Sequence, residues 1–145
     1  MATTYKSTLA AAGQKAYTPV AGVSVVAYAE ITATTAAVND IYQMIPIPNG
    51  ARVVNWTVGA DQLDSNGSPT ITISLGDSGS ATRYVNASTA IGRTTSAAPL
   101  QAVNIGGFGF QYTADDMLIV TISAAAATFV AGKIRVYIEY MPAWY

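Results

Sequence analysis

The fold is decided by the stretch from Pro69 to Val85, which reads PTITISLGDSGSATRYV. Apolar residues alternate with Thr and Ser up to Leu75, so that one side of the segment is apolar and the other carries hydroxyl groups. A period of two residues is typical of a half-buried β-strand. The run from Gly76 to Ser80 then breaks the pattern with turn residues, and Arg83 opens a second apolar segment. The stretch therefore predicts a strand, a tight turn and a returning strand.

The same pattern recurs from Gly22 onward and predicts an all-β protein. Further strands are expected at 23–32, 41–47, 52–60, 82–86, 108–112, 117–123 and 133–141. With the strand at 70–75 this gives about eight strands, and no segment sustains the 3.6-residue period of a helix. Val54, Trp56 and Val58 are expected to share one side of their strand. Pro46 favours an edge position for its strand, because proline has no N–H to donate to a neighbour.

Two antiparallel sheets packed as a jelly roll explain about eight short strands joined by long crossing loops. We therefore expect an antiparallel β-sandwich of jelly-roll type over residues 21–145, with an up-and-down barrel as the alternative. Residues 1–20 are rich in Ala, Thr and Ser and are expected to form an extended arm or a disordered terminus. Strands and helices do not alternate, which argues against a parallel α/β sheet.

Charged side chains are scarce in this sequence. Only 10% of the 145 residues are charged and the formal net charge is −1, whereas soluble domains usually carry about 25% charged residues. A surface with so few charges is expected to be covered by protein partners in an assembly. The scattered, nearly balanced charge argues against nucleic acid or an anionic membrane as a partner. The longest apolar stretch, 117–132, holds no charge but is too short and too polar to span a bilayer.

The chain contains neither Cys nor His. Disulfides, thiolate nucleophiles, the usual zinc sites and imidazole bases are therefore excluded. Asp115 and Asp116 are adjacent in sequence, so on a strand their side chains point to opposite sides and do not form a catalytic pair. The run from Gly106 to Gly109 lacks the residues of a phosphate-binding loop and is interpreted as a bend where backbones approach closely.

The acidic loops are the remaining candidates for a metal site. Asp61, Asp64 and Asn66 share one loop and Asp77 lies in the next turn, and oxygen ligands of this kind suit Ca²⁺. Their spacing does not match an EF-hand loop, and Asp and Asn are also the usual residues of turns. We therefore expect no metal, no cofactor, no small-molecule substrate and no enzymatic activity.

Aromatic side chains are the best candidates for a binding surface. The chain has nine Tyr, three Phe and two Trp, and exposed aromatic residues favour protein contacts or stacking on sugars. Because charge is so low, protein contacts are the preferred interpretation. The residues expected to contact a partner or a second copy are Tyr5, Leu9, Tyr17, Tyr28, Tyr137, Trp144 and Tyr145.

Several motifs resemble those of small head proteins of tailed bacteriophages. The segment 47–54 reads IPNGARVV and is similar to their "IPxGARV" strand entry. The run 61–85 resembles their "D-x-LD…G-x-P-T-x-x-I-x-L-G-D…x-R-Y/F" pattern. The segment 115–121 reads DDMLIVT and is similar to their "DD-x-I-x-V-T" strand, and 132–140 resembles their closing strand. The resemblance covers about Pro46 to Tyr140, and none of these motifs carries a catalytic residue.

The resemblance implies a capsid decoration, or cement, protein that is made in the host cytoplasm and lies on the outer surface of the virion. Such proteins commonly form trimers on the major capsid protein, so the implied partners are that protein and further copies of this chain. The arm is then expected to run along neighbouring subunits through Tyr5, Leu9 and Tyr17, or to add a strand to one of them. The alternative is a receptor- or carbohydrate-binding jelly-roll module of a phage head or tail fibre, for which the leads are Trp56, Trp144 and the loop 61–66.

Overall fold

The computed structural model of the chain describes residues 2–13, 23–93, 100–101 and 104–143, apart from the side chains at positions 9, 100 and 101. Within these residues it contains nine strands, a short helix and a 3₁₀ turn. Their bounds are β1 Thr4–Lys6, α1 Thr8–Ala12, β2 Val25–Ala33, β3 Ile41–Ile47, β4 Arg52–Ala60, β5 Thr72–Gly76, β6 Val85–Ser88, β7 Leu100–Gln101, η1 Ile105–Gly107, β8 Asp116–Ala124 and β9 Gly132–Met141. No helix in the described residues is long and apolar enough to cross a membrane.

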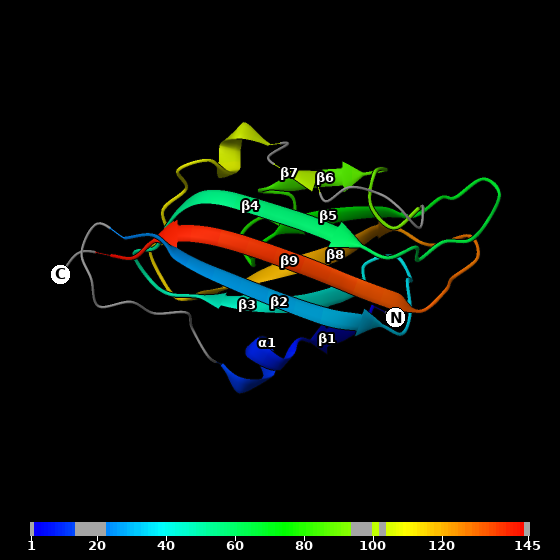
Figure 1. Cartoon of the computed structure of the whole chain (residues 1–145), viewed down its shortest axis with the longest axis horizontal. Coiled ribbons are helices and arrows are strands. Elements are labelled where there is room, and N and C mark those ends of the chain that lie inside the picture. Colours follow the sequence, from blue (N-terminus) through cyan, green and yellow to red (C-terminus); the bar gives the residue numbers. More distant parts are fainter. Residues whose placement is uncertain (1, 14–22, 94–99, 102–103, 144–145) are drawn as a thin grey trace.

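The strands form two sheets packed face to face (Figure 1). One has five strands in the order β1-β3-β8-β5-β6, and the other has four in the order β2-β9-β4-β7. β2 pairs with β9, β3 with β8, β4 with β7 and β5 with β6, and all four pairs are antiparallel. Among β2 to β9, the first strand thus pairs with the last, the second with the second-to-last, and so on to the central pair β5 and β6. Along the chain, each connection from β2 to β9 crosses from one sheet to the other, except the connection from β5 to β6. This is a long hairpin rolled up, the topology of a jelly roll, so the predicted β-sandwich is confirmed.

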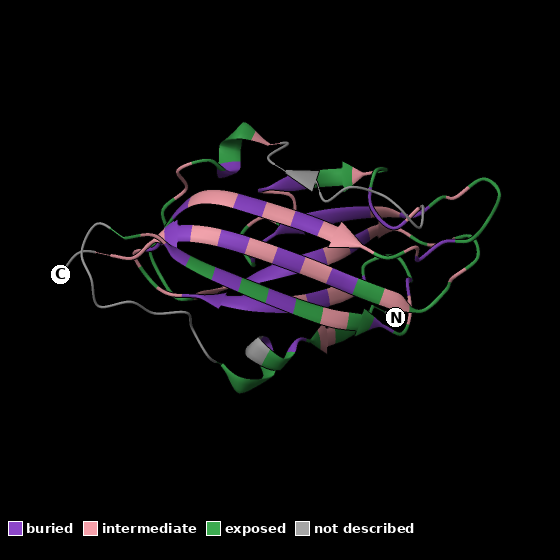
Figure 2. Cartoon of the chain, in the orientation of Figure 1, coloured by how far each residue is buried: buried purple, intermediate pink, exposed green. Residues whose placement is uncertain are grey.

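Burial alternates along the strands as their sequences predict. In β9, every second residue faces the core and has no exposed surface, while the residues between face outward (Figure 2). The inward residues of β9 are Ile134, Val136, Ile138 and Tyr140. In β2 the buried residues Val25, Ala27 and Ala29 alternate with exposed neighbours in the same way. The period of two in the sequence therefore sets which side of each strand enters the core.

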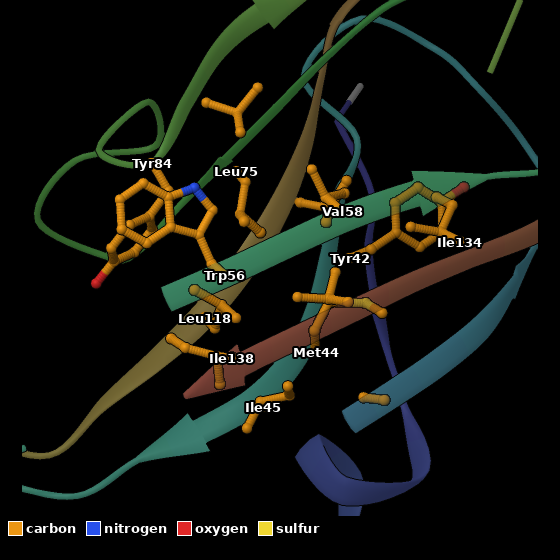
Figure 3. Close-up of a cluster of buried hydrophobic side chains, with 14 of the residues drawn as sticks. Tyr42, Met44, Ile45, Trp56, Val58, Leu75, Tyr84, Leu118, Ile134 and Ile138 are labelled. Atoms are coloured by element: carbon orange, nitrogen blue, oxygen red, sulfur yellow. The ribbon is translucent and has the colours of Figure 1, made fainter. Parts of the chain in front are cut away.

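A β-bulge corrects the expectation for β4. The register between β4 and β9 shifts after Val53, so that Val53 is buried and Val54 is only partly so. Val54 therefore does not share a side with Trp56 and Val58, because the extra residue of a bulge reverses the alternation. Trp56 lies in the core, where its ring centroid is 5.0 Å from that of Tyr84 (Figure 3).

The N-terminal segment lies against its own domain as far as it is described. β1 pairs in parallel with residues 41–43 of β3, so β3 is not the edge strand that Pro46 suggested. Pro46 lies beyond the end of β1 and has no partner strand on that side among the described residues, which is why it is tolerated there. Ser7 is buried, donates its hydroxyl to the carbonyl of Met44 and accepts from the N–H of Ala10 at 3.2 Å. Ser7 thereby anchors the start of α1.

Two further elements differ from expectation. No continuous strand forms at 108–112: residues 109–112 exchange backbone hydrogen bonds with 50–53, but the pairing is limited to an isolated antiparallel bridge between Gln111 and Arg52. The chain instead makes the 3₁₀ turn η1 immediately before it. The short strand β7 falls in a Ser-, Thr- and Ala-rich stretch for which no strand was expected, because its composition shows no period.

The buried carboxylate of Asp64 joins two loops at one end of the sandwich. It accepts hydrogen bonds of 2.8 to 3.3 Å from the backbone N–H groups of Asn66, Thr70, Ile71, Ala127 and Thr128. Burial alone would raise the pKa of Asp64, but the backbone hydrogen bonds favour the charged form and hold its pKa well below the usual range. The β4–β5 and β8–β9 loops are therefore fixed to each other by one ionised side chain.

The register of β9 is tested by substitutions on its two sides. Ile138→Ala is expected to lower the free energy of unfolding by about 2–5 kcal/mol, because it removes buried carbon atoms and leaves a cavity. Lys133→Ala on the outward side is the control and should change little, since its ion pair with Glu30 is exposed. Urea denaturation followed by tryptophan fluorescence measures both. Similar losses in the two variants would contradict the register.

Asp64→Asn tests the joining of the loops. At pH 6 it is expected to cost about 2–4 kcal/mol, because an amide leaves several buried N–H groups without a good acceptor. The lowered pKa of Asp64 means that the wild type keeps this stabilisation above pH ~4, the usual carboxyl pKa, and loses it as the pH falls further. The stability difference between wild type and variant should therefore shrink in urea titrations at lower pH. Asp61→Asn, in the exposed part of the same loop, is the control, and a loss as large as that of Asp64→Asn would refute the assignment.

Candidate interaction surface

Three of the residues expected to make contacts are described in full. Tyr28 and Tyr137 lie opposite each other in the pairing of β2 with β9, on the outward side of the four-stranded sheet. Tyr28 is 51% exposed and Tyr137 is half-buried. Tyr5 instead stacks on Tyr42, with ring centroids 5.0 Å apart, and its hydroxyl lies 3.2 Å from that of Thr35. The structure thus brings Tyr28 and Tyr137 together, and it packs Tyr5 against its own domain.

The other four expected contact residues remain predictions. Leu9 lies in α1, but its side chain is outside the described part of the structure. Tyr17, Trp144 and Tyr145 lie outside the described residues altogether.

Charged side chains on the outward side of the four-stranded sheet neutralise one another. Lys133 Nζ donates to Glu30 Oε1 at 2.7 Å, and Arg135 Nε lies 3.5 Å from Glu30 Oε2. Arg135 also donates to Asp61 at 2.7 Å. The hydrogen bond from Lys133 is the main reason why the pKa of Glu30 is lowered. The tyrosine hydroxyls of this side donate to carboxylates as well, and Tyr28 reaches Glu30 at 3.1 Å. The charged groups of this outer face are therefore paired with one another, and Val26 and Tyr28 lie exposed beside them.

In the acidic loop 61–66, the carboxylates accept hydrogen bonds from the protein itself. Asp64 is occupied by the five backbone N–H groups, and Asp61 accepts from the N–H of Lys133 as well as from Arg135. No group of three or more His, Cys, Asp or Glu side chains in the described ranges is placed to hold a metal ion. These carboxylates therefore stabilise the backbone conformation of the loops.

Asp77 lies at the centre of a buried polar cluster. Its carboxylate pairs with Arg83 and accepts from the hydroxyl of Tyr112 at 2.9 Å, and the hydroxyls of Tyr112 and Tyr84 lie 2.7 Å apart. Burial raises the pKa of both tyrosines, so they remain neutral. The guanidinium of Arg83 lies 3.6 Å from the ring centroid of Phe110. These contacts fix residues 77–84, which we call the 77–84 segment.

An apolar turn that sequence analysis does not identify is hydrogen-bonded to the 77–84 segment through Asn104. Asn104 donates from its side chain to the carbonyl of Thr82 at 3.0 Å and from its backbone to the carbonyl of Tyr84 at 3.2 Å. Its side-chain oxygen accepts from the N–H of Gly106 and so caps η1. Gly107 packs so closely that a Cβ there would lie 2.5 Å from the ring of Tyr84. The glycine-rich run is thus a bend with close backbone approach, as its composition indicated.

The turn presents two large apolar side chains to the outside. Ile105 is 91% exposed and Phe108 is 68% exposed, the highest values for large apolar residues in the described part of the chain. We call these two residues and the glycines between them the 105–108 turn. It projects from one side of the sandwich near β7 (Figures 1 and 2). In the sequence, only the Asn104 cap and the two glycines mark the turn, and they do not indicate that Ile105 and Phe108 are exposed.

The outer face of the five-stranded sheet differs from that of the four-stranded sheet. The outward positions of β3, β8 and β5 carry no charged side chain, except for Asp116 at the start of β8. The nearest charge at the edge of the sheet is Lys6 in β1. A groove of about 350 Å³ lies here, with Ile41, Met117 and Ile119 among its lining residues. Its other lining residues are Thr4, Gln43 and 77–81, and Asp77, the one ionisable residue among them, is paired with Arg83.

The leads for a carbohydrate-binding surface differ in their exposure where they are described. Trp56 is 1% exposed and lies in the core, so its ring is not accessible to a sugar. The loop 61–66 is organised around the buried Asp64, and its residues Asp61, Ser65 and Asn66 are exposed. Trp144 lies outside the described residues.

Comparison with models of protein families finds no match, and neither does comparison with curated protein sequences. Solved structures do match. A chain of the cyanophage Pam1 capsid asymmetric unit is 31% identical, with a TM-score of 0.76, over 90% of this chain and 95% of that one. A chain of the capsid of Ralstonia phage GP4 is 22% identical, with a TM-score of 0.84, over 98% and 99% of the two chains. A chain of the acidic stable capsid structure of Helicobacter pylori bacteriophage KHP30 is 19% identical, with a TM-score of 0.60, over 86% and 92%.

The GP4 and KHP30 likenesses show a shared fold. The Pam1 likeness goes further, because 31% of the residues are identical over most of both chains. With a jelly-roll body and a sequence related to a capsid chain, the protein belongs to the same family as that chain of the Pam1 capsid and is a phage capsid-associated structural protein of the virion.

Proposed function

We propose that the chain is a decoration, or cement, protein that binds the outer surface of the major capsid protein shell as a trimer and stabilises it. The observation that carries this proposal is the unequal charge of the two outer faces. The four-stranded sheet turns a paired, charged network outward, whereas the five-stranded sheet has no charged outward side chain between Lys6 and Asp116. In a virion structural protein, the first suits solvent and the second suits a protein neighbour.

The role in this proposal is mechanical rather than catalytic. The two sheets form a rigid body, and loops fixed by buried carboxylates keep its surface in one shape. Three copies on one trimer contact the shell together, so that individually weak contacts add up through their high effective concentration. A body that clamps neighbouring shell subunits opposes their separation when packaged DNA presses outward.

The N-terminal segment supplies one such contact in this proposal. β1 is the end strand of its sheet, so its outward edge has no neighbouring strand in the described part of the chain. Thr3 accepts from the N–H of Ile41 and Ser7 donates to the carbonyl of Gln43, so alternate residues bond inward. The N–H groups of Thr4 and Lys6 therefore point to the open edge. A strand of a shell subunit added at this edge would bind by β-augmentation.

Lys6→Pro tests the open edge. Proline removes the outward N–H at a position where an edge strand tolerates it. Loss of one hydrogen bond of about 1 kcal/mol is expected to weaken binding to shells about fivefold. Lys6→Ala, which removes the charge but keeps the N–H, is the matched control and should bind like wild type at moderate salt. Co-sedimentation with undecorated shells measures the affinities, and unchanged binding of Lys6→Pro would remove the edge from the proposal.

The main test mixes the purified protein with undecorated shells of the major capsid protein from the same virion. We expect the protein to co-sediment with the shells until the binding sites are saturated. We also expect decorated shells to disassemble at a higher temperature than undecorated ones. Failure to bind such shells would contradict the decoration role. Binding to sugars on a glycan array without binding to shells would favour the receptor-binding alternative.

A further inference from the structure

We propose that Asn66 is a site of spontaneous deamidation in the folded protein. In this reaction the backbone nitrogen of Gly67 displaces the side-chain amide of Asn66, which leaves as ammonia. The product is an aspartate or an isoaspartate in the loop that Asp64 holds in place. Because a virion does not renew its proteins, the product accumulates with the age of the particle. The inference uses only residues of this chain and does not depend on the proposed function.

The sequence contains two Asn-Gly pairs, Asn49-Gly50 and Asn66-Gly67. Asparagine is a thermolabile residue, and a following glycine favours the reaction because it has no side chain to obstruct attack by its own nitrogen. Attacking nitrogen and amide carbon belong to one dipeptide, so the ring closure is intramolecular. The sequence makes both pairs candidates, and the structure separates them.

Water is the only co-reactant that the reaction needs. The N–H of Gly67 loses its proton to water or hydroxide, and the nitrogen forms a bond to Cγ of Asn66. The bond from Cγ to Nδ2 then breaks, and Nδ2 takes a proton from water and leaves as ammonia. A water molecule opens the resulting succinimide ring at one of its two carbonyls, which gives aspartate or isoaspartate. No group is oxidised or reduced.

The attacking nitrogen of Gly67 is free. Within the ranges that the structure describes, the N–H of Gly67 has no hydrogen-bond partner, and the residue is exposed. A Cβ built on Gly67 would meet no atom within 4 Å, so the space around it is open. Water can therefore take the proton, and the nitrogen can approach Asn66 without breaking a contact of its own.

The side chain of Asn66 is polarised for this attack. Its Oδ1 accepts from the backbone N–H of Ser68 at 2.9 Å. Negative charge develops on this oxygen when the nitrogen adds to Cγ, so a donor held there stabilises the transition state. Nδ2 donates to the hydroxyl of Thr128 at 3.1 Å, but this hydrogen bond is exposed, and water replaces it at little cost when the group leaves.

The same reaction is hindered at the other pair. Asn49 is exposed like Asn66, so the difference lies in the nitrogen of the glycine. The N–H of Gly50 donates to the carbonyl of Tyr112 at 2.8 Å, and the nitrogen can attack only after this hydrogen bond breaks. Gly50 is also closely packed, since a Cβ built on it would lie 2.3 Å from that of Ala143. Asn49 is therefore protected by the fold.

Modification at position 66 affects the hydrogen bonds of Asp64. The Asp64 carboxylate accepts from the N–H groups of Asn66 at 3.2 Å and Thr70 at 2.8 Å, so the backbone between them is held at both ends. An isoaspartate lengthens this backbone by one methylene group, and either product adds a negative charge beside Asp64. Both changes weaken the link between the β4–β5 and β8–β9 loops, which lie side by side at one end of the sandwich (Figure 1).

The first experiment ages the purified full-length protein in warm, mildly alkaline buffer and follows both asparagines by mass spectrometry. Trypsin cuts after Lys15, Arg52 and Arg83 and so places the two asparagines on separate peptides. Electron-transfer fragmentation distinguishes isoaspartate from aspartate. We expect position 66 to convert at least about fivefold faster than position 49, because one hydrogen bond must break first at Gly50.

Two controls separate the effect of the fold from that of the sequence. In guanidinium chloride neither glycine nitrogen is held, so the two rates should converge. Gly67→Ala, whose new Cβ has open space, should fold normally and slow conversion at position 66 several-fold, with position 49 unchanged. Equal rates at the two positions of the folded protein, or faster conversion at position 49, would overturn the proposal. Conversion at position 66 that Gly67→Ala does not slow would also overturn it.

The second experiment measures the effect on the loops. Anion exchange separates converted from unconverted chains by the added negative charge, and urea titrations compare their unfolding. Converted chains are expected to unfold at a lower urea concentration. Asn66→Asp, which adds the charge without lengthening the backbone, should lie between converted and fresh protein, and aged Gly67→Ala should unfold like fresh Gly67→Ala. Converted chains that unfold like fresh protein would show that the modification does not reach Asp64.

Discussion

The pairing of β9 with a strand on each side is the constraint on which the rest of the structure depends. β9 runs antiparallel to β2 and to β4 over nearly its whole length. Its inward residues, among them Val136 and Ile138, fill the centre of the core, and its outward residues Lys133 and Arg135 carry the charged network. A slip of one residue would exchange the two sets, so both the core and the outer face depend on one register.

Buried carboxylates explain how a chain with few charges keeps well-ordered loops. Asp40, Asp64 and Asp77 are buried, although acidic side chains number only eight in the sequence. Each bonds to backbone N–H groups of a loop, as in the link from Asp40 to Ala37 at 3.0 Å. Charge is thus used for ordering the interior of loops, and the surface becomes even poorer in charge than the composition suggests.

The sequence predicts the strands well because their signal is local. The period of two in 133–141 and in 25–31 is enough to assign both the strand and its buried side. Features that depend on distant partners were not predictable in the same way. The bulge at Val53 is visible only against β9, and β1 is too short to be recognised without β3.

The candidate surface was predicted only in part, for the same physical reason. Tyr28 could be placed outward from its strand, but nothing local distinguishes Phe108 from a core residue. Its exposure follows from Gly107 packing against Tyr84, a contact between residues more than twenty positions apart. The strand expected at 108–112 is reduced to an isolated bridge: residues 109–112 hydrogen-bond to 50–53 beside β4, and the turn η1 precedes them.

The rolled-hairpin topology also governs how the chain reaches its native state. β2 leaves the ribosome early, yet its partner β9 is the last of the described strands to be synthesised. Until then, the apolar inner side of β2 has no partner and its edge is open to other nascent chains. Pairings of such high contact order form slowly, so productive folding competes with aggregation from the first strand of the sandwich to the last.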